Sequence, residues 1–99
     1  MKLKLKKKHK KESSKWLSRH INDEFVLKSK KEGFRSRSSY KLIQINEKFD
    51  FLHSSKNILD LGCAPGGWLQ VSKKFSSVET KILGVDKLSI EAIPGVWFY

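Results

Sequence analysis

The feature that most constrains the fold is a glycine-rich turn set between two short apolar runs. Residues 57–61 (NILDL) predict a buried strand, and residues 62–67 (GCAPGG) follow it at once. Residues 68–75 suit a helix, and residues 81–86 (KILGVD) predict a second strand that ends in an acid. The order strand, turn, helix, strand is one βαβ unit, whose two strands are parallel. An α/β fold is therefore predicted, and residues 93–99 begin a further apolar run.

The chain ahead of this unit has helical character. Ser13 and Ser14 are suited to cap a helix that contains Trp16, whose spacing favours packing against the core over stacking on a base. A second helix is predicted from Asn22 or Asp23 to about residue 32, because Gly33 fits the position that ends a helix. A third is predicted over residues 39–49, with Leu42, Ile45 and Phe49 on one face. These patterns divide the chain into three segments: a basic disordered arm (1–12), a helical segment (13–56) and a βαβ segment (57–99).

Positive charge is concentrated at the front of the chain. The net charge is +11; residues 1–41 hold 15 Lys and Arg against 4 Asp and Glu, whereas residues 42–99 hold 6 of each. A basic front of this kind attracts polyanions through counterion release, which makes the attraction salt-dependent. A solubilising tail that binds nothing specific is the alternative. A membrane-surface helix is disfavoured, because only Leu3 and Leu5 interrupt the first lysines.

The remaining composition excludes several classes of protein. No apolar run approaches the roughly 18 residues that a membrane span requires. The single cysteine, Cys63, excludes a disulfide scaffold and a cysteine-built zinc site, favours a cytoplasmic setting, and is expected to serve packing. His9, His20 and His53 have no ligand spacing, so no metal is predicted.

The turn itself indicates a nucleoside ligand. Gly62 permits a tight turn, and Gly66 allows the backbone to approach a ligand closely. Asp86 stands where an acid binds ribose hydroxyls in α/β folds, and Asp60 is placed to orient the loop or to meet a cationic part of the ligand. There is no GK[ST] phosphate loop, and Ala64 and Pro65 (residues 64–65) spoil the dinucleotide fingerprint. S-adenosylmethionine therefore suits the turn better than a dinucleotide; a turn without ligand and a dinucleotide-dependent oxidoreductase are the alternatives.

These residues resemble a known family. Residues 60–68 (DLGCAPGGW) are similar to the S-adenosylmethionine loop of FtsJ-type (RrmJ-like) ribosomal RNA 2′-O-ribose methyltransferases, in which DLG-x-APGGW is a specific signature. Residues 33–42 (GFRSRSSYKL) resemble the family segment G-[LF]-R-S-R-x-x-[FY]-K-L. Residues 14–26 resemble the leading helix of the family, and Gly95–Val96 resembles its short G-V stretch. The resemblance therefore covers residues 13–99. It implies a partial Rossmann-like S-adenosylmethionine-dependent methyltransferase fold: N-terminal helices, one βαβ unit and the start of a third strand.

The resemblance also implies a role for individual residues. Gly66 and Trp68 would contact the methyl donor, Gly62 would shape the loop, and Asp86 would bind the donor's ribose.

On the acceptor side, the resemblance makes Lys41 the first member of a catalytic Lys-Asp-Lys-Glu set, and Arg35 and Arg37 contacts of RNA phosphates. Chemistry agrees for Lys41, since a lysine can orient the attacking 2′-hydroxyl or take its proton.

The implied activity is 2′-O-methylation of a uridine in large-subunit ribosomal RNA, on the assembled subunit, by a cytoplasmic monomer that uses no metal. The resemblance places the other three catalytic residues beyond Tyr99. We therefore expect a truncated N-terminal part that is inactive alone, with the strand over residues 57–61 at an unpaired edge. The alternative function is a non-catalytic RNA-binding module that works through the basic front.

Overall fold

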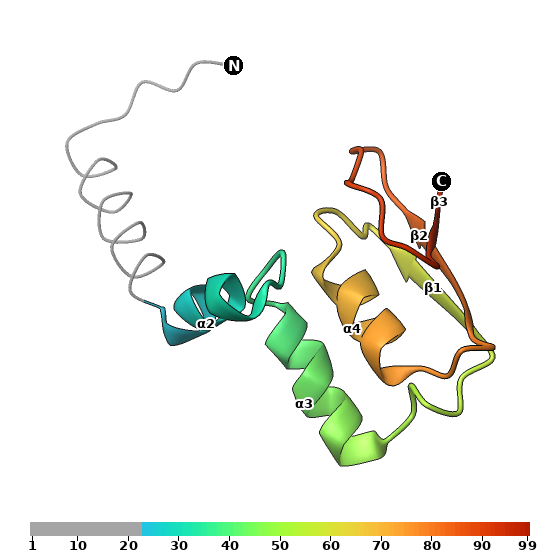
Figure 1. Cartoon of the computed structure of the whole chain (residues 1–99), viewed down its shortest axis with the longest axis horizontal. Coiled ribbons are helices and arrows are strands. Elements are labelled where there is room, and N and C mark those ends of the chain that lie inside the picture. Colours follow the sequence, from blue (N-terminus) through green and yellow to red (C-terminus); the bar gives the residue numbers. More distant parts are fainter. Residues whose placement is uncertain (1–22) are drawn as a thin grey trace.

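The computed structural model describes residues 23–99, which form three helices and a small sheet (Figure 1). In chain order the elements are α2 (Glu24–Glu32), α3 (Ser39–Phe49), β1 (Asn57–Leu61), α4 (Gly67–Phe75), β2 (Lys81–Val85) and β3 (Trp97–Phe98). The helices and the first two strands match the predicted ones to within one or two residues, whereas β3 covers only the end of the apolar run that begins at residue 93. The predicted basic arm and the predicted helix around Trp16 lie outside the described residues.

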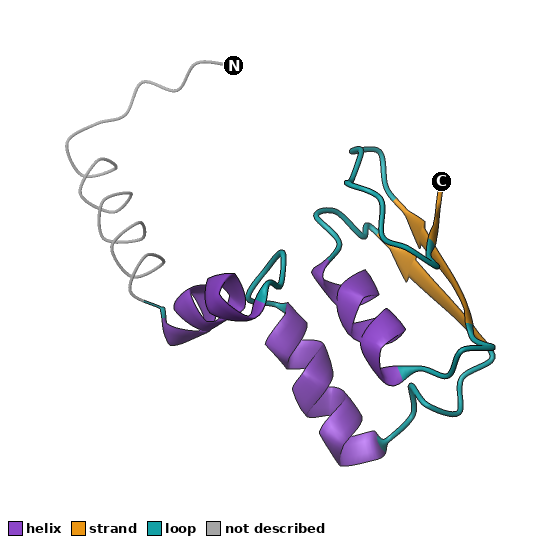
Figure 2. Cartoon of the chain, in the orientation of Figure 1, coloured by secondary structure: helices purple, strands orange, loops and turns teal. Residues whose placement is uncertain are grey.

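The sheet is parallel, in the order β1-β2-β3. Ile58 of β1 pairs with Ile82 of β2, and Leu83 of β2 pairs with Trp97 of β3. The chain passes from β1 through α4 to β2, which is the predicted βαβ unit, and α4 lies against one face of the sheet (Figure 2). Among the described strands β1 is at an edge, as predicted.

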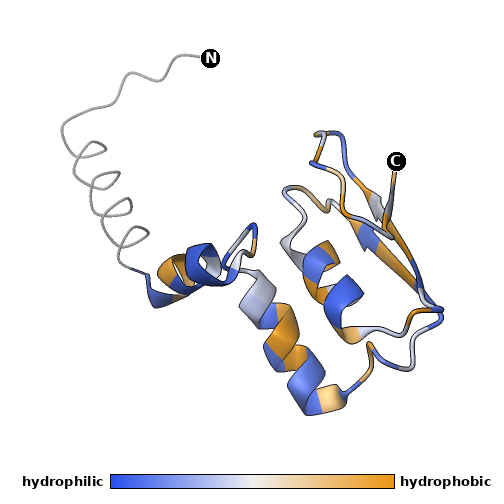
Figure 3. Ribbon diagram, viewed as in Figure 1, coloured by the Kyte–Doolittle hydropathy of each residue, from blue (hydrophilic) through white to orange (hydrophobic). Residues whose placement is uncertain are grey.

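The core lies on both sides of α4. Leu69 and Val71, which point to opposite sides of this helix, are each 0 % exposed. Leu69 belongs to a cluster with Cys63 and Ile82 that faces the sheet, and Val71 belongs to a second cluster that joins α4 to α3. Helices α3 and α4 each carry hydrophobic as well as hydrophilic residues (Figure 3), as expected for helices that are partly packed and partly exposed. The two clusters make one continuous core, because Ile58 packs against both.

Two predicted apolar stretches are less buried than their sequence indicates. On the predicted apolar face of α3, Leu42 is buried, but Phe49, the last residue of the helix, is 65 % exposed. On the sheet face away from α4, Leu59 and Trp97 are also exposed and line an apolar groove of about 320 Å³. No described element covers this face.

Helix α2 begins and ends as its sequence dictates. The Asp23 carboxylate accepts hydrogen bonds from the backbone N–H groups of Phe25 (2.8 Å) and Val26 (3.2 Å). Gly33 ends the helix in the left-handed conformation, with φ of 80°. The chain then turns sharply through residues 34–38 into α3, which places this connection beside α4.

Candidate functional site

The glycine-rich turn forms a loop at the carboxyl end of β1, tied to the end of β2. The backbone N–H groups of Gly62 and Cys63 both donate to the Val85 carbonyl, at 2.7 and 3.2 Å. Gly62 and Gly66 have φ of 73° and 112°, conformations that favour glycine. A ligand at this edge of a parallel sheet meets the loop and the end of β2 together, which is where open α/β sheets bind ligands.

Two carboxyl groups stand at this edge in different environments. Asp86 accepts a hydrogen bond from the Leu88 N–H at 2.9 Å and one from the Ala64 N–H at 2.8 Å, and these bonds lower the pKa of Asp86. In Asp60, Oδ2 is buried without a hydrogen-bond partner, and burial followed by repulsion from Asp86 raises the pKa of Asp60. Asp86 therefore fixes the loop, while Asp60 offers an unsatisfied acceptor that an ammonium group would satisfy.

Cys63 lies in the same loop and is a packing residue, as its sequence context predicts. It is 5 % exposed and belongs to the cluster with Leu69 and Ile82. Burial, and then the nearby Asp60 and Asp86 carboxyls, raise the pKa of the Cys63 thiol. A thiol held neutral in an apolar setting is a poor nucleophile.

The start of α4 is docked on the start of α3. The Trp68 indole N–H donates to the Ser38 carbonyl at 2.9 Å. A Cβ at Gly67 would collide with the hydroxyls of Ser36 and Ser39, so only glycine permits this close approach. The predicted donor contact Trp68 thus connects the loop directly to the helix that carries Lys41.

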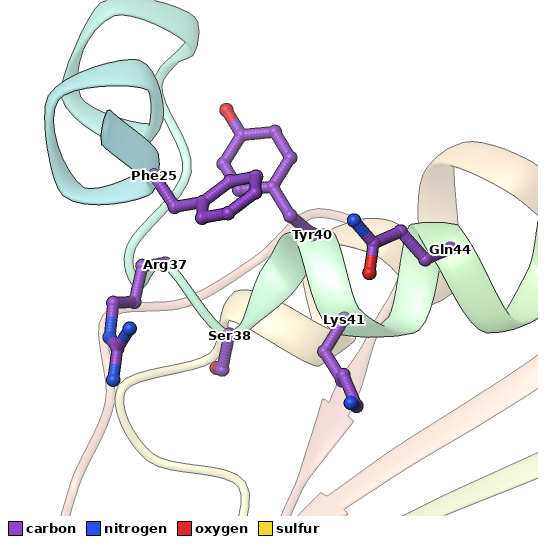
Figure 4. A pocket seen from close by; sticks show the side chains of 6 residues that line it. All are labelled: Phe25, Arg37, Ser38, Tyr40, Lys41 and Gln44. Atoms are coloured by element: carbon purple, nitrogen blue, oxygen red, sulfur yellow. The ribbon is translucent and has the colours of Figure 1, made fainter. Parts of the chain in front are cut away.

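Lys41 lines a cleft of about 380 Å³ between α2 and α3 (Figure 4). Its lining combines two rings with polar and cationic groups: Phe25, Arg37, Ser38, Tyr40, Lys41 and Gln44. The Phe25 and Tyr40 rings pack at 5.6 Å between centroids. The Tyr40 hydroxyl donates to Glu32 at 2.6 Å, and burial together with Glu32 raises the pKa of Tyr40 to about 12. Such a mixture of rings and cations suits a nucleotide.

The two predicted RNA-binding arginines have different contacts. Arg37 is exposed and forms an ion pair with Asp23 at 2.9 Å, at the mouth of the Lys41 cleft. Arg35 is half-buried, and its guanidinium donates to backbone carbonyls at Pro65, Glu91 and Ala92. The structure thus places Arg35 against the loop and Arg37 beside Lys41. An RNA contact remains a prediction for both.

Sequence reasoning missed one residue that shapes the site. Gln70 of α4 accepts from the Arg35 N–H at 2.8 Å and donates to the Gly33 carbonyl at 3.1 Å. It thereby satisfies two backbone groups of the connection between α2 and α3. The only signal in the sequence is a glutamine among the apolar residues of α4.

Neither a metal centre nor a membrane span emerges from the described residues. Within residues 23–99 no three His, Cys, Asp or Glu side chains form a group that could hold a metal ion. None of the helices in that same part of the chain is long and apolar enough to cross a membrane.

The parallel βαβ unit, its glycine loop and the acids at the ends of both strands are features of a Rossmann-like α/β fold. The model of the FtsJ-like methyltransferase family matches residues 34–99, and the chain belongs to this family. The chain is 48 % identical over 97 residues to the ribosomal RNA large subunit methyltransferase E of Novosphingobium aromaticivorans, covering 98 % of this chain and 43 % of that protein. It is 46 % identical over 101 residues to the protein of the same name from Rickettsia bellii, covering 97 % and 44 %.

A solved structure agrees with the fold. A ribosomal RNA methyltransferase from Plasmodium falciparum superimposes with a TM-score of 0.58 at 44 % identity, over 67 % of this chain and 37 % of that one. The predicted family and fold class are therefore confirmed. The chain spans about two fifths of the length of the curated relatives that it matches.

Proposed function

We propose that this chain supplies the methyl-donor site and part of the RNA-binding face of an S-adenosylmethionine-dependent 2′-O-ribose methyltransferase. The RNA proposed is large-subunit ribosomal RNA, with a uridine as target, and the setting is cytoplasmic. The observation that carries the proposal is the loop at residues 62–66, which lies with Asp60 and Asp86 at one edge of the parallel sheet. The names of the relatives support ribosomal RNA as the substrate.

The residues at this edge fit the donor. S-adenosylmethionine is a nucleoside with a sulfonium and an ammonium group, and when bound it supplies an electrophilic methyl group. The unsatisfied Oδ2 of Asp60 suits the ammonium, and Asp86 stands at the end of β2, where acids bind ribose hydroxyls. Gly62 has open space beside it, whereas Trp68 borders the loop from α4.

The acceptor side is proposed to be the Lys41 cleft. The Trp68–Ser38 hydrogen bond ties this side to the donor loop. Lys41 would orient the ribose 2′-hydroxyl or take its proton, and Arg37 at the cleft mouth would meet a phosphate. In this proposal residues 13–56 bind the RNA, and residues 57–99 bind the methyl donor. The family resemblance implies three catalytic residues outside these 99, so we propose that these 99 residues bind donor and RNA without transferring the methyl group.

Donor binding is the decisive test. S-adenosylhomocysteine binds without reacting, and a ligand that binds only the folded state raises the unfolding midpoint. We expect it to raise the thermal midpoint measured by circular dichroism, and Asp86→Asn to weaken that shift. NAD serves as the control ligand. A midpoint raised by NAD and unchanged by S-adenosylhomocysteine would refute the proposed donor and favour a dinucleotide site.

The alternative is a non-catalytic RNA-binding module, which the net charge of +11 and its concentration in residues 1–41 favour. Both functions predict RNA binding that weakens steeply with salt. The two functions differ in whether the chain binds the donor analogue. An RNA-binding module should not bind S-adenosylhomocysteine, and its affinity for RNA should be the same in Asp86→Asn.

A further inference from the structure

Arg35 lies on the connection between α2 and α3, and its backbone is held by α4. The Arg35 N–H donates to Gln70 Oε1 at 2.8 Å, and the neighbouring Gly33 carbonyl accepts from Gln70 Nε2 at 3.1 Å. These two bonds fix the start of the Arg35 side chain one turn along α4 from the glycine loop. The backbone from which the Arg35 side chain extends is therefore held against α4.

The guanidinium of Arg35 is bonded to backbone carbonyls of two separate segments. Nη1 donates to the Pro65 carbonyl at 3.1 Å and to the Glu91 carbonyl at 2.7 Å, and Nη2 donates to the Ala92 carbonyl at 3.4 Å. Three of the five N–H donors of a guanidinium are thereby used on the protein. A side chain that waits for a phosphate would instead present its donors to solvent.

Contact between Arg35 and the loop extends beyond these bonds. A Cβ at Gly66 would lie 2.9 Å from Arg35 Nη1 and 3.4 Å from Ile93 Cδ1. The guanidinium thus rests against the Gly66 backbone, where a side chain would displace it. This adds a packing reason for glycine to the conformational one, a φ of 112°.

The loop is held from two sides by groups of opposite charge. The Asp86 carboxylate accepts from the Ala64 N–H, and the Arg35 guanidinium donates to the carbonyl of the next residue, Pro65. Asp86 connects the loop to the end of β2, and Arg35 connects it to residues 91–92 and to α3. One carboxylate and one guanidinium fix two successive residues of the loop.

We propose that Arg35 is a positioning residue that holds the donor loop in its binding shape and does not contact RNA phosphates. The proposal rests on the proposed donor site. The proposal predicts that, for donor binding, the planar shape of the side chain at residue 35 is more important than its positive charge. A lysine retains the charge that a phosphate needs, but its ammonium cannot span carbonyls at residues 65, 91 and 92 as the planar guanidinium does.

The test compares Arg35→Lys, Arg35→Ala and wild type in the full chain. We expect Arg35→Lys to weaken binding of S-adenosylhomocysteine about tenfold by calorimetry, the effect of losing one or two such bonds. Lys48→Ala, which removes an exposed charge at the far end of α3, is the matched control for charge. The slope of RNA affinity against salt should be the same for Arg35→Ala and wild type, since no phosphate contact is lost.

A second measurement needs no ligand. Hydrogen exchange of the Ala64 amide, whose N–H is bonded to Asp86, reports opening of the loop. In Arg35→Lys we expect it to accelerate about tenfold while the amides of β2 stay unchanged. If wild type fails to bind S-adenosylhomocysteine, the proposed donor site is wrong, yet the exchange result still decides the role of Arg35.

Three results would overturn the proposal. In the first, Arg35→Lys binds S-adenosylhomocysteine and exchanges Ala64 like wild type. In the second, Arg35→Ala lowers the salt slope by about one, which marks a lost phosphate contact. In the third, exchange accelerates equally in the loop and in β2, which marks a general loss of stability in place of a local one.

Discussion

Gly84, the next-to-last residue of β2, packs closely against α4. A Cβ built there would lie 2.6 Å from Leu69 Cδ1 and 2.9 Å from Cys63 Sγ. Leu69 is 0 % exposed, so it cannot relieve the contact by turning out into solvent. Overpacking a filled core by one carbon typically costs about 1–3 kcal/mol. For a domain of this size the melting midpoint should then fall by roughly 5–20 °C in Gly84→Ala.

The sign of this effect separates packing from backbone propensity. In a strand, glycine is less favourable than alanine by roughly 0.5–1 kcal/mol, so propensity alone predicts that Gly84→Ala stabilises the protein. Packing predicts that Gly84→Ala destabilises the protein. Leu69→Val supplies the matched control, because it removes the crowded carbon at the cost of about 1 kcal/mol.

The assay is urea unfolding followed by circular dichroism, on both single variants and the double variant. We expect the double variant to be more stable than the sum of the single effects predicts, because the added carbon occupies the space that valine vacates. A wild-type midpoint for Gly84→Ala, or strict additivity in the double variant, would refute the claimed crowding between β2 and α4.

Three further results are expected from the site. Because the pKa of Asp60 is raised, its carboxylate becomes protonated at a higher pH than an ordinary aspartate, whose pKa is about 3.9. Affinity for S-adenosylhomocysteine should therefore fall as the pH is lowered through the raised pKa of Asp60. Asp60→Asn should bind this ligand weakly and without that pH dependence. Tyr40 should ionise at about pH 12, measured by absorbance at 295 nm. The stability that goes with this raised pKa is complete below about pH 10 and is lost as the pH rises from there to about 12, and Tyr40→Phe should remove this loss. Trp68→Phe, which keeps a ring but loses the bond to Ser38, should lower the unfolding free energy in urea by about 1 kcal/mol.

The elements of the fold could be predicted because their signals are local. Asp23 caps α2 through amides two and three residues ahead, and Gly33 ends it through its own backbone conformation. The strands on either side of α4 are marked by apolar runs and by the glycines at residues 62 and 66. In each case the residues that decide the structure stand close together in the sequence.

The contacts of the site join residues that are far apart in the chain. Arg35 lies 30 residues from Pro65 and 56 from Glu91, and no local rule indicates that its guanidinium meets carbonyls there. The acid at residue 86 was predicted to lie at the site, whereas its bond to the Ala64 amide was not. Residue type and position identify the site, but which group pairs with which depends on how the chain folds back.

The connection between α2 and α3 shows why this matters for function. Its basic residues suggest an RNA surface, yet its contacts face the glycine loop and the start of α4: Arg35 on the Pro65 carbonyl, the Ser38 carbonyl on Trp68, and small serines against Gly67. Methyl transfer needs the donor and the attacking hydroxyl in one fixed alignment, and small displacements are costly. The connection contacts the loop proposed to bind the donor and continues into the helix that carries Lys41, so it can hold the two proposed sides of the site in register. Its sequence is therefore constrained by packing against the loop as well as by charge.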